Sequence, residues 1–214
     1  NPDRKYKRGK VLTAEQLDKL DRFGRYLDSD NDGIPYRTIP GTHPSKGSFF
    51  TRGSSHDEYA VYSEDSPTYV RIMDRLLKKF ETAKSLVPKP HLYQKENKNK
   101  SGLLFFGTTT QSAEEAMDLF KEQGIEFDAI QLKAFPFNND VSEFIEAHET
   151  VFVIEQNRDA QMRTLLVNEL EVDPKKLKKV LNFDGTPITG DFIVNQILSQ
   201  LPKSYLKNKE AVAI

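Results

Sequence analysis

The sequence has no cysteine among its 214 residues. A chain without cysteine forms no disulfide, no thiolate zinc site and no thiol nucleophile, and it supplies no cysteine ligand to an iron–sulfur cluster. An excess of charge of one sign is also lacking, because 31 basic residues are balanced by 32 acidic ones, and nothing in this balance favours nucleic acid as a partner. No run of 18 apolar residues predicts a membrane span. We therefore expect a cytoplasmic protein or a piece of a cytoplasmic assembly.

Apolar residues are also scarce, at 37% of the chain. The length allows one sizeable core plus an extension, and the low apolar content indicates that part of the chain lies extended on another surface. The start, NPDRKYKRGK, lacks the apolar stretch of a signal peptide, and its first residue is Asn. We expect a fragment of a longer chain.

The first hundred residues hold two predicted helices separated by a long irregular segment. Thr13 is a candidate cap for the first, over 13–27, whose apolar positions recur at helical spacing at Leu17, Leu20, Phe23 and Leu27. A second helix is predicted to begin with Ser66 as its cap and Pro67 at its first position, with an apolar stripe of Val70, Met73, Leu77 and Phe80. About forty residues between them lack periodicity, which is unusual inside a compact domain, so we expect them to lie against another domain or subunit.

The remainder, 101–214, alternates short apolar runs with amphipathic segments. Buried strands are predicted at 103–107, 127–132, 151–155 and 179–183, with a fifth, edge strand at 91–96. Helices are predicted near 112–123, 140–148, 158–170 and 190–201. Strands that alternate with helices predict an α/β fold with a mainly parallel sheet covered on both faces.

One acidic run resembles half of a calcium loop. Asp28, Asp30 and Asp32 alternate before Gly33, which matches positions 1, 3, 5 and 6 of a twelve-residue loop. Position 12 is Ile39, where a bidentate glutamate is required. Two interpretations stay open: an Asx-rich turn in which the glycine takes a positive φ, and a partial cation site completed by a distant carboxylate.

The turn after the first strand of the second half is the most suggestive piece chemically. It contains Gly107, Thr108, Thr109 and Thr110, and Ser112 with Glu115 has the spacing of a capping box. Hydroxyls and free amides at a helix start can hold an anion such as a phosphate, so a cofactor-binding site is one interpretation and a plain strand-to-helix turn is the other. The second glycine and the lysine of phosphate-binding loops are absent.

Candidate interface residues fall in two places. The irregular segment offers aromatic anchors and a polar group, namely Tyr36, Phe49, Phe50, Arg52, His56, Asp57, Glu58 and Tyr59. Because adjacent side chains point in different directions, the triplet His56, Asp57 and Glu58 favours contact with a partner over a metal or catalytic cluster. Glu155 and Asn157 lie at the end of a predicted strand, at the carboxyl edge of a parallel sheet where ligands tend to lie, and Asn157 is also a candidate helix cap.

Several long motifs resemble one enzyme family. DNDGIPYRTIPGTHP, FFTRGSSHDEYAVYSED, GTTTQSAEEAMDLF and VFVIEQNRDAQMRTLL occur in this order along nearly the whole chain. Together they are similar to the C-terminal part of the alpha subunit of 2-oxoacid:ferredoxin oxidoreductases, in particular the 2-oxoglutarate type (2-oxoglutarate synthase).

The resemblance implies a fold for each part. Residues 101–214 would form a three-layer α/β/α sandwich like the transketolase C-terminal domain, with about five mainly parallel strands and one antiparallel strand. Residues 1–100 would form the helical and extended connection from a missing pyrimidine-side domain.

The resemblance also implies oxidative decarboxylation of a 2-oxoacid to an acyl-CoA, with electrons passed to ferredoxin. Thiamine diphosphate, magnesium, iron–sulfur clusters and coenzyme A would be bound by other domains or by the beta subunit, which is the expected partner, and this part would hold no cofactor and no catalytic residue. It would serve assembly and positioning and be inactive alone. The alternatives are a calcium-dependent interaction module and a stand-alone coenzyme A or nucleotide-binding domain.

Overall fold

The computed structural model describes residue 3 and residues 5–93 and 99–201, and it divides the chain into two compact units, Asn1–Leu86 and Val87–Ile214. The division falls before residue 100 because the strand β1 (His91–Tyr93) pairs with the sheet of the second unit. Residues 94–96 of the predicted edge strand lie outside the described residues. No helix in the described part of the chain combines the length and the apolar character of a membrane span.

In the first unit the helix predicted over 13–27 forms only at its start, and the rest of that prediction is wrong. Helix α1 (Ala14–Asp18) starts with the expected cap, in which the Thr13 side chain and Gln16 form a capping box, but it ends after five residues. The Lys46 ammonium donates hydrogen bonds to the carbonyl oxygens of Asp18 and Leu20, at 3.1 and 2.8 Å. These carbonyls therefore bond to a distant side chain instead of continuing the helical ladder, which local spacing does not reveal.

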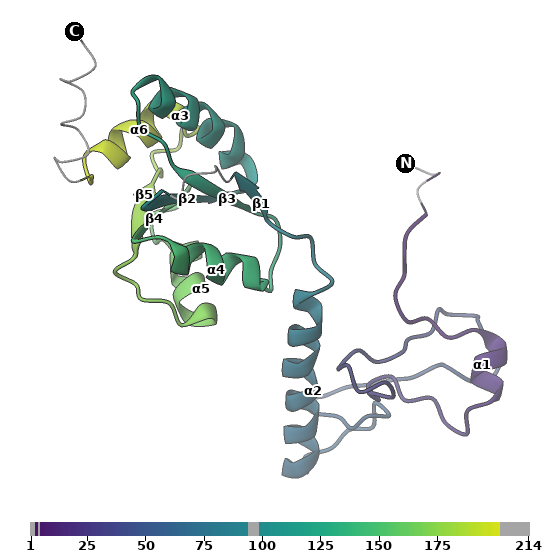
Figure 1. Cartoon of the computed structure of the whole chain (residues 1–214). Helices are drawn as coiled ribbons and strands as arrows, with labels where there is room; N and C mark the ends of the chain where they lie inside the picture. Colours follow the sequence, from purple (N-terminus) through teal and green to yellow (C-terminus); the bar gives the residue numbers. More distant parts are fainter. Residues whose placement is uncertain (1–2, 4, 94–98, 202–214) are drawn as a thin grey trace, which may run out of the picture. The chain divides into compact units, whose positions relative to one another are not determined.

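Helix α2 (Ser66–Lys84) forms as predicted with Pro67 in its first turn, but the Asp65 carboxylate, not Ser66, caps it by accepting the amide of Thr68 at 2.9 Å. The predicted apolar stripe is largely exposed, as Val70 and Leu77 are 55% and 67% accessible. Its buried residues are Thr68 and Ile72. Irregular chain with isolated bridges accounts for the rest of this unit (Figure 1).

The second unit is an α/β domain with a five-stranded sheet. Its strands are β1, β2 (Ser101–Phe106), β3 (Asp128–Leu132), β4 (Thr150–Glu155) and β5 (Leu177–Leu181), in the spatial order β1-β3-β2-β4-β5. All pairings are parallel except that of β1 with β3, which is antiparallel. The predicted fold class, a mainly parallel sheet with one antiparallel strand, is confirmed.

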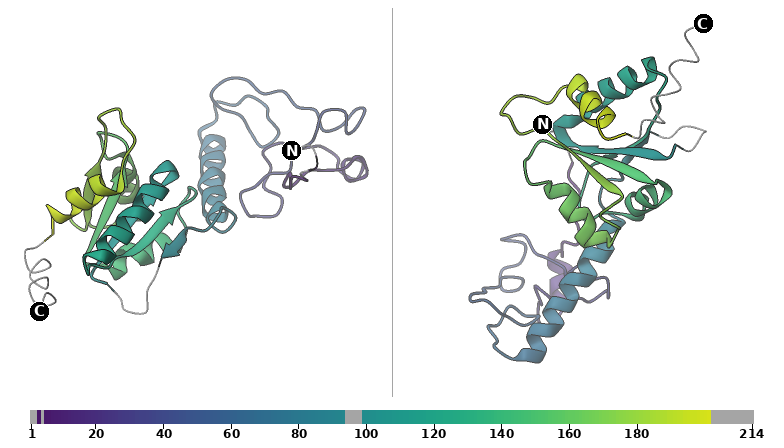
Figure 2. Two further views of the ribbon diagram at one scale, coloured as in Figure 1. Left: turned by 90° about the horizontal axis from the view of Figure 1, so that it is seen from above. Right: turned by 90° about the vertical axis from the view of Figure 1, so that its left-hand side faces the viewer.

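Helices cover both faces of this sheet. Helices α3 (Thr110–Glu122) and α6 (Gly190–Leu198) lie on one face, and α4 (Asn139–Ala147) and α5 (Gln161–Leu170) lie on the other, as Figure 1 and the right-hand view of Figure 2 show. Alternate strand residues supply the two cores. Leu103 and Phe105 pack toward α3 and α6, whereas Leu104 packs toward α4 and α5. These runs are apolar on both faces because each face is covered, which gives the three layers of a sandwich.

Candidate functional site

The strand order defines one place where ligands bind in folds of this kind. The connection after β2 leads to β3 on one side of β2, whereas β4 lies on the other side of β2 and its connection leads away to β5. In an open parallel sheet, two neighbouring strands whose connections leave in opposite directions have a crevice between their carboxyl ends. The crevice of this domain therefore lies after Phe106 of β2 and Glu155 of β4.

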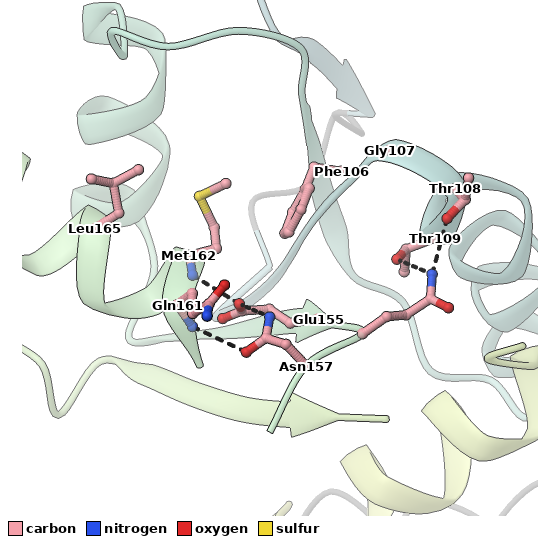
Figure 3. Close-up of a pocket in the computed structure, with 10 residues that line it drawn as sticks. Phe106, Gly107, Thr108, Thr109, Glu155, Asn157, Gln161, Met162 and Leu165 are labelled. Atoms are coloured by element: carbon pink, nitrogen blue, oxygen red, sulfur yellow. Dashed lines mark hydrogen bonds between the residues drawn. The ribbon is translucent and has the colours of Figure 1, made fainter. Parts of the chain in front are cut away.

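A pocket of about 460 Å³ occupies that position (Figure 3). Its volume is within the range of about 300 to 1,000 Å³ that is typical of small-molecule sites. It is lined by Phe106, Gly107, Thr108, Thr109, Glu155, Gln156, Asn157, Gln161, Met162 and Leu165. Five of the candidate residues from the sequence, Gly107, Thr108, Thr109, Glu155 and Asn157, are thus brought together.

The turn after β2 builds one wall of the pocket. Gly107 has a φ of +59° and opens a short 3-10 helix, η1 (Gly107–Thr109), that leads into α3. The Gln156 side-chain amide donates to the hydroxyl oxygens of Thr108 and Thr109, at 3.1 and 3.2 Å. This pair of bonds ties the turn after β2 to the turn after β4 and holds the two hydroxyls at the rim.

Two other residues predicted for this site do not line it. The Thr110 hydroxyl donates to the carbonyl of Gly107 at 2.7 Å and accepts from the side chain of Gln131 at 2.9 Å, which closes the turn. The predicted capping box at Ser112 is wrong, because α3 starts before it, and the Ser112 hydroxyl instead donates to the carbonyl of Ile188 at 2.7 Å.

The opposite wall is organised by the buried Glu155 carboxylate. It accepts the backbone amides of Met162 and Arg163 in the first turn of α5, at 2.8 and 3.0 Å, and the side-chain amide of Asn157 at 2.8 Å. Asn157 in turn accepts the amide of Gln161 at 3.2 Å. The positive end of α5 is therefore already neutralised by a carboxylate of the chain itself.

Some lining residues were not singled out from the sequence as site residues. Gln156 and Gln161 flank the turn after β4, and Met162 and Leu165 lie in the helix that was predicted near 158–170. The strand ends alone indicate the crevice, and the helix positions become part of it because α5 packs beside β4.

The acidic turn in the first unit is not assembled as a cation site. The Lys10 ammonium lies 2.7 Å from Asp30 and 2.6 Å from Asp32, and the carboxylate of Asp28 accepts the amide of Asp32 at 3.0 Å. Among the described residues no group of three or more histidines, cysteines, aspartates or glutamates is placed to hold a metal ion. The turn is instead bonded to α2, because Arg75 donates to the carbonyl of Gly33 at 3.1 Å.

The bond to Lys10 predicts an acid-sensitive turn. Hydrogen bonds from the Lys10 ammonium lower the pKa of Asp30 and of Asp32 from the ordinary value. A lowered folded-state pKa stabilises the fold above the unfolded pKa, and this contribution is lost as the pH falls through the folded pKa. We expect the NMR signal of the Ile34 amide, which donates to the Asp32 carboxylate, to report this titration. In Lys10→Met the midpoint should move to higher pH, and an unchanged midpoint would show that Lys10 does not hold these carboxylates.

The predicted interface residues of the irregular segment are used in different ways. The carboxylate of Asp57 accepts amides of its own loop, the His56 ring stacks on Tyr26 at 3.9 Å, and Glu58 pairs with Arg71 at 3.2 Å. The three adjacent side chains do point apart, as expected. The guanidinium of Arg22 lies 4.2 Å from the ring of Tyr59, and Lys10 lies 5.2 Å from the ring of Tyr36.

Phe49, Phe50 and Arg52 remain at the surface of the same segment. Phe49 is 46% exposed and makes a tilted ring contact with Phe23 and an edge contact with Tyr26, whereas Phe50 is 79% exposed. Arg52 is exposed and has no hydrogen bond or ion pair with a described residue.

Together, the fold and the pocket define a doubly wound α/β domain with a candidate ligand site at its topological switch point. No family model matches the chain. It is 26% identical over 185 residues to 2-oxoacid:ferredoxin oxidoreductase 2, subunit alpha, from Aeropyrum pernix, which covers 85% of the chain and 27% of that relative. It is 24% identical over 192 residues to the subunit alpha of 2-oxoacid:ferredoxin oxidoreductase 1 from Sulfurisphaera tokodaii, covering 87% of the chain and 28% of the relative.

The fold also has a solved counterpart. It is the structure of 2-oxoglutarate:ferredoxin oxidoreductase from Magnetococcus marinus with 2-oxoglutarate, coenzyme A and succinyl-CoA bound. The match covers 86% of this chain and 31% of the matched chain, with a TM-score of 0.74 and 21% identity. The chain spans less than a third of the length of the curated relatives named above. It is therefore similar to one part of much longer alpha subunits.

The residues present do not fit an iron–sulfur cluster or a magnesium diphosphate. The sequence has no cysteine to ligate an iron–sulfur cluster. The described residues contain no metal-binding group, and Asn31 stands where a magnesium diphosphate motif would need glycine. No Lys, Arg or His lines the pocket to neutralise a diphosphate.

Proposed function

We propose that this chain is the C-terminal part of the alpha subunit of a 2-oxoacid:ferredoxin oxidoreductase, where it serves assembly and positioning. The observation that carries the proposal is the sequence similarity to such alpha subunits along 85% and 87% of the chain. The matched fold supports it. The boundary between a connecting segment and a transketolase C-terminal-like domain is part of the same proposal.

The reaction proposed for the whole complex is the oxidative decarboxylation of a 2-oxoacid in the cytoplasm. Coenzyme A would accept the acyl group, and ferredoxin would accept two electrons. We propose 2-oxoglutarate as the substrate, because the motifs of the chain resemble that type and the matched structure contains it. Thiamine diphosphate, magnesium and the clusters would be held by other domains and by the beta subunit, since the sequence has no cysteine and the described residues offer no group of ligands for a metal ion.

The beta subunit is the proposed partner of the irregular segment. Phe50 and Arg52 are the strongest candidates for contact, because the other predicted residues are engaged within the first unit whereas these two face outward. Buried aromatic and arginine side chains dominate the binding energy of protein interfaces.

The test uses the intact alpha chain co-expressed with its beta subunit. Phe50→Glu should weaken alpha–beta association by about tenfold or more, since a charge would be buried at a contact built for an aromatic ring. Size-exclusion chromatography at several concentrations measures the association, and 2-oxoglutarate-dependent ferredoxin reduction measures the activity.

Phe183→Glu is the matched control, because Phe183 is 63% exposed and lies in the second unit, outside the irregular segment. It should leave association unchanged. Equal association of both variants and the wild type would refute docking through Phe50. If the wild-type complex fails to reduce ferredoxin with every 2-oxoacid tested, the enzyme assignment is refuted.

A further inference from the structure

We propose that the pocket between the ends of β2 and β4 binds a neutral heteroaromatic ring of the nucleobase class, and that it does not bind a phosphate group. The proposal replaces the anion interpretation of the Gly107 turn. It holds for a free nucleoside and for the base end of a larger nucleotide, which share this ring. It does not depend on the proposed function.

One side of the pocket has the surface that a flat ring requires. Phe106 at the end of β2 faces Met162 and Leu165 from the first turns of α5, as Figure 3 shows. All three are partly buried and pack on the core beneath α4 and α5. Aromatic rings bind bases by stacking, and a methionine thioether makes favourable contacts with aromatic rings.

The other side offers hydrogen-bonding groups without net charge. Thr109 is 2% exposed, and its hydroxyl oxygen accepts from Gln156. Its O–H hydrogen has no acceptor among the described residues, so a buried donor lines the pocket without a partner. Burying such a donor is costly unless an acceptor is supplied, and a ring nitrogen or carbonyl of a base would supply it.

The Gln156 amide completes a pattern of donors and acceptors on this side. Its NH₂ group bonds to Thr108 and Thr109, which leaves its carbonyl oxygen to accept from an exocyclic amine. The Gln161 side chain, at the mouth, adds a second amide. Alternating donors and acceptors match the edge of a heterocycle better than the acceptor-only surface of a phosphate.

Electrostatics argue against an anion at the same place. The described residues that line the pocket include no lysine, arginine or histidine, and they include the Glu155 carboxylate. That carboxylate already accepts the first free amides of α5, so this helix end, which also borders the pocket, is not open to a phosphate. A multiply charged ligand would find no cation there and would lie close to the Glu155 carboxylate.

Adenosine, inorganic pyrophosphate and ADP are the probes, titrated into the isotopically labelled 214-residue chain and followed by amide chemical shifts. Adenosine should shift the amides of Gly107, Thr108, Thr109 and Gln161, with half-saturation on the order of 0.1 to 1 mM for a ligand of this size in an open pocket. Pyrophosphate should shift none of them. ADP should bind within about threefold of adenosine, because its phosphates find no cation.

Two variants test the walls separately. Thr109→Val keeps the shape but removes the hydroxyl, which is both the donor for the ligand and an acceptor of Gln156, and should weaken adenosine binding about five- to tenfold. Met162→Trp should fill the apolar side of the pocket and weaken adenosine binding about tenfold or more. Met117→Trp is the matched control, because Met117 lies on α3 and packs on the other core. Circular dichroism and thermal unfolding show whether each variant folds.

No shift with 5 mM adenosine in the wild-type chain would overturn the proposal. Pyrophosphate shifting the same amides, or ADP binding more than tenfold more tightly than adenosine, would restore the anion interpretation instead. Neither result bears on association with the beta subunit, so failure here and failure of the proposed function are distinguishable.

Discussion

Replacement of Glu155 by leucine is expected to destabilise the second unit by about 3 kcal/mol or more. The carboxylate is fully buried and accepts the amides of Met162 and Arg163 at 2.8 and 3.0 Å. Leucine accepts no hydrogen bond, so these two amides and the Asn157 side chain would each lose an acceptor in a site with little water. A buried polar group left without its partner costs about 1 to 3 kcal/mol.

Glu155→Gln separates charge from hydrogen bonding. Glutamine keeps the shape and one acceptor oxygen, but its NH₂ group would face amide donors. We expect Glu155→Gln to destabilise the second unit by about half as much as Glu155→Leu, since a charged acceptor bonds more strongly than a neutral one. Amide hydrogen exchange of β4 measures the free energy of opening of this unit without requiring both units to unfold together.

Glu149→Leu is the matched control for this series. Glu149 is an exposed glutamate whose carboxylate pairs with Lys100 at 3.0 Å, with both side chains 70% exposed. Exposed pairs contribute about 0 to 1 kcal/mol, so this substitution should change little. Equal stability of Glu155→Leu and Glu149→Leu would mean that the Glu155 carboxylate is not the acceptor that starts α5.

The second unit was predictable from sequence because its signals are local. Each apolar run sits between segments of helical periodicity, and a sheet covered on both faces requires runs of that kind. The Gly107 turn and Glu155 lie at the carboxyl ends of two of these strands, so the crevice could be placed as well. The other wall, Met162 and Leu165, was not assigned to the site because only the packing of α5 beside β4 turns these core positions toward a pocket.

The failures occur where distant parts of the chain compete with local preference. Ser112 and Glu115 have the spacing of a capping box, yet Glu115 accepts the amide of Gly190 at 3.0 Å, from the start of α6. The helix predicted through 27 stops at Asp18, whose carbonyl oxygen accepts a hydrogen bond from the Lys46 ammonium. The partners lie 75 and 28 residues away in the sequence, and no short motif encodes them.

Gly33→Ala combines a local and a distant effect, and we expect it to destabilise the first unit by about 3 kcal/mol or more. The sequence predicts a positive φ at this turn glycine, and the structure has +78°. That conformation costs an L-residue about 1 to 2 kcal/mol. The sequence does not predict the second effect, which is that a Cβ here would lie 2.8 Å from the Cα of Lys79 and 2.9 Å from the carbonyl carbon of Lys78.

Those atoms belong to the backbone of α2, so no side-chain rotation can relieve the contact. The turn must move away from the helix, and the bonds from Arg75 to the carbonyl of Gly33 and from Thr82 to that of Asp32 must lengthen or break. Close packing of the acidic turn on α2 is thus the physical reason for a glycine at this position, and a calcium loop is not required to explain it.

Gly41→Ala is the control that separates the two effects. Gly41 has a φ of +81°, but a Cβ at this position would have no neighbouring atom within 4 Å, so its substitution should cost only the conformational term, about 1 to 2 kcal/mol. The difference between the two variants, followed by hydrogen exchange of α2 amides, isolates the contact with the helix. If Gly33→Ala costs no more than Gly41→Ala, the turn does not pack on α2 in solution, and the bonds from Arg75 and Thr82 do not organise the first unit.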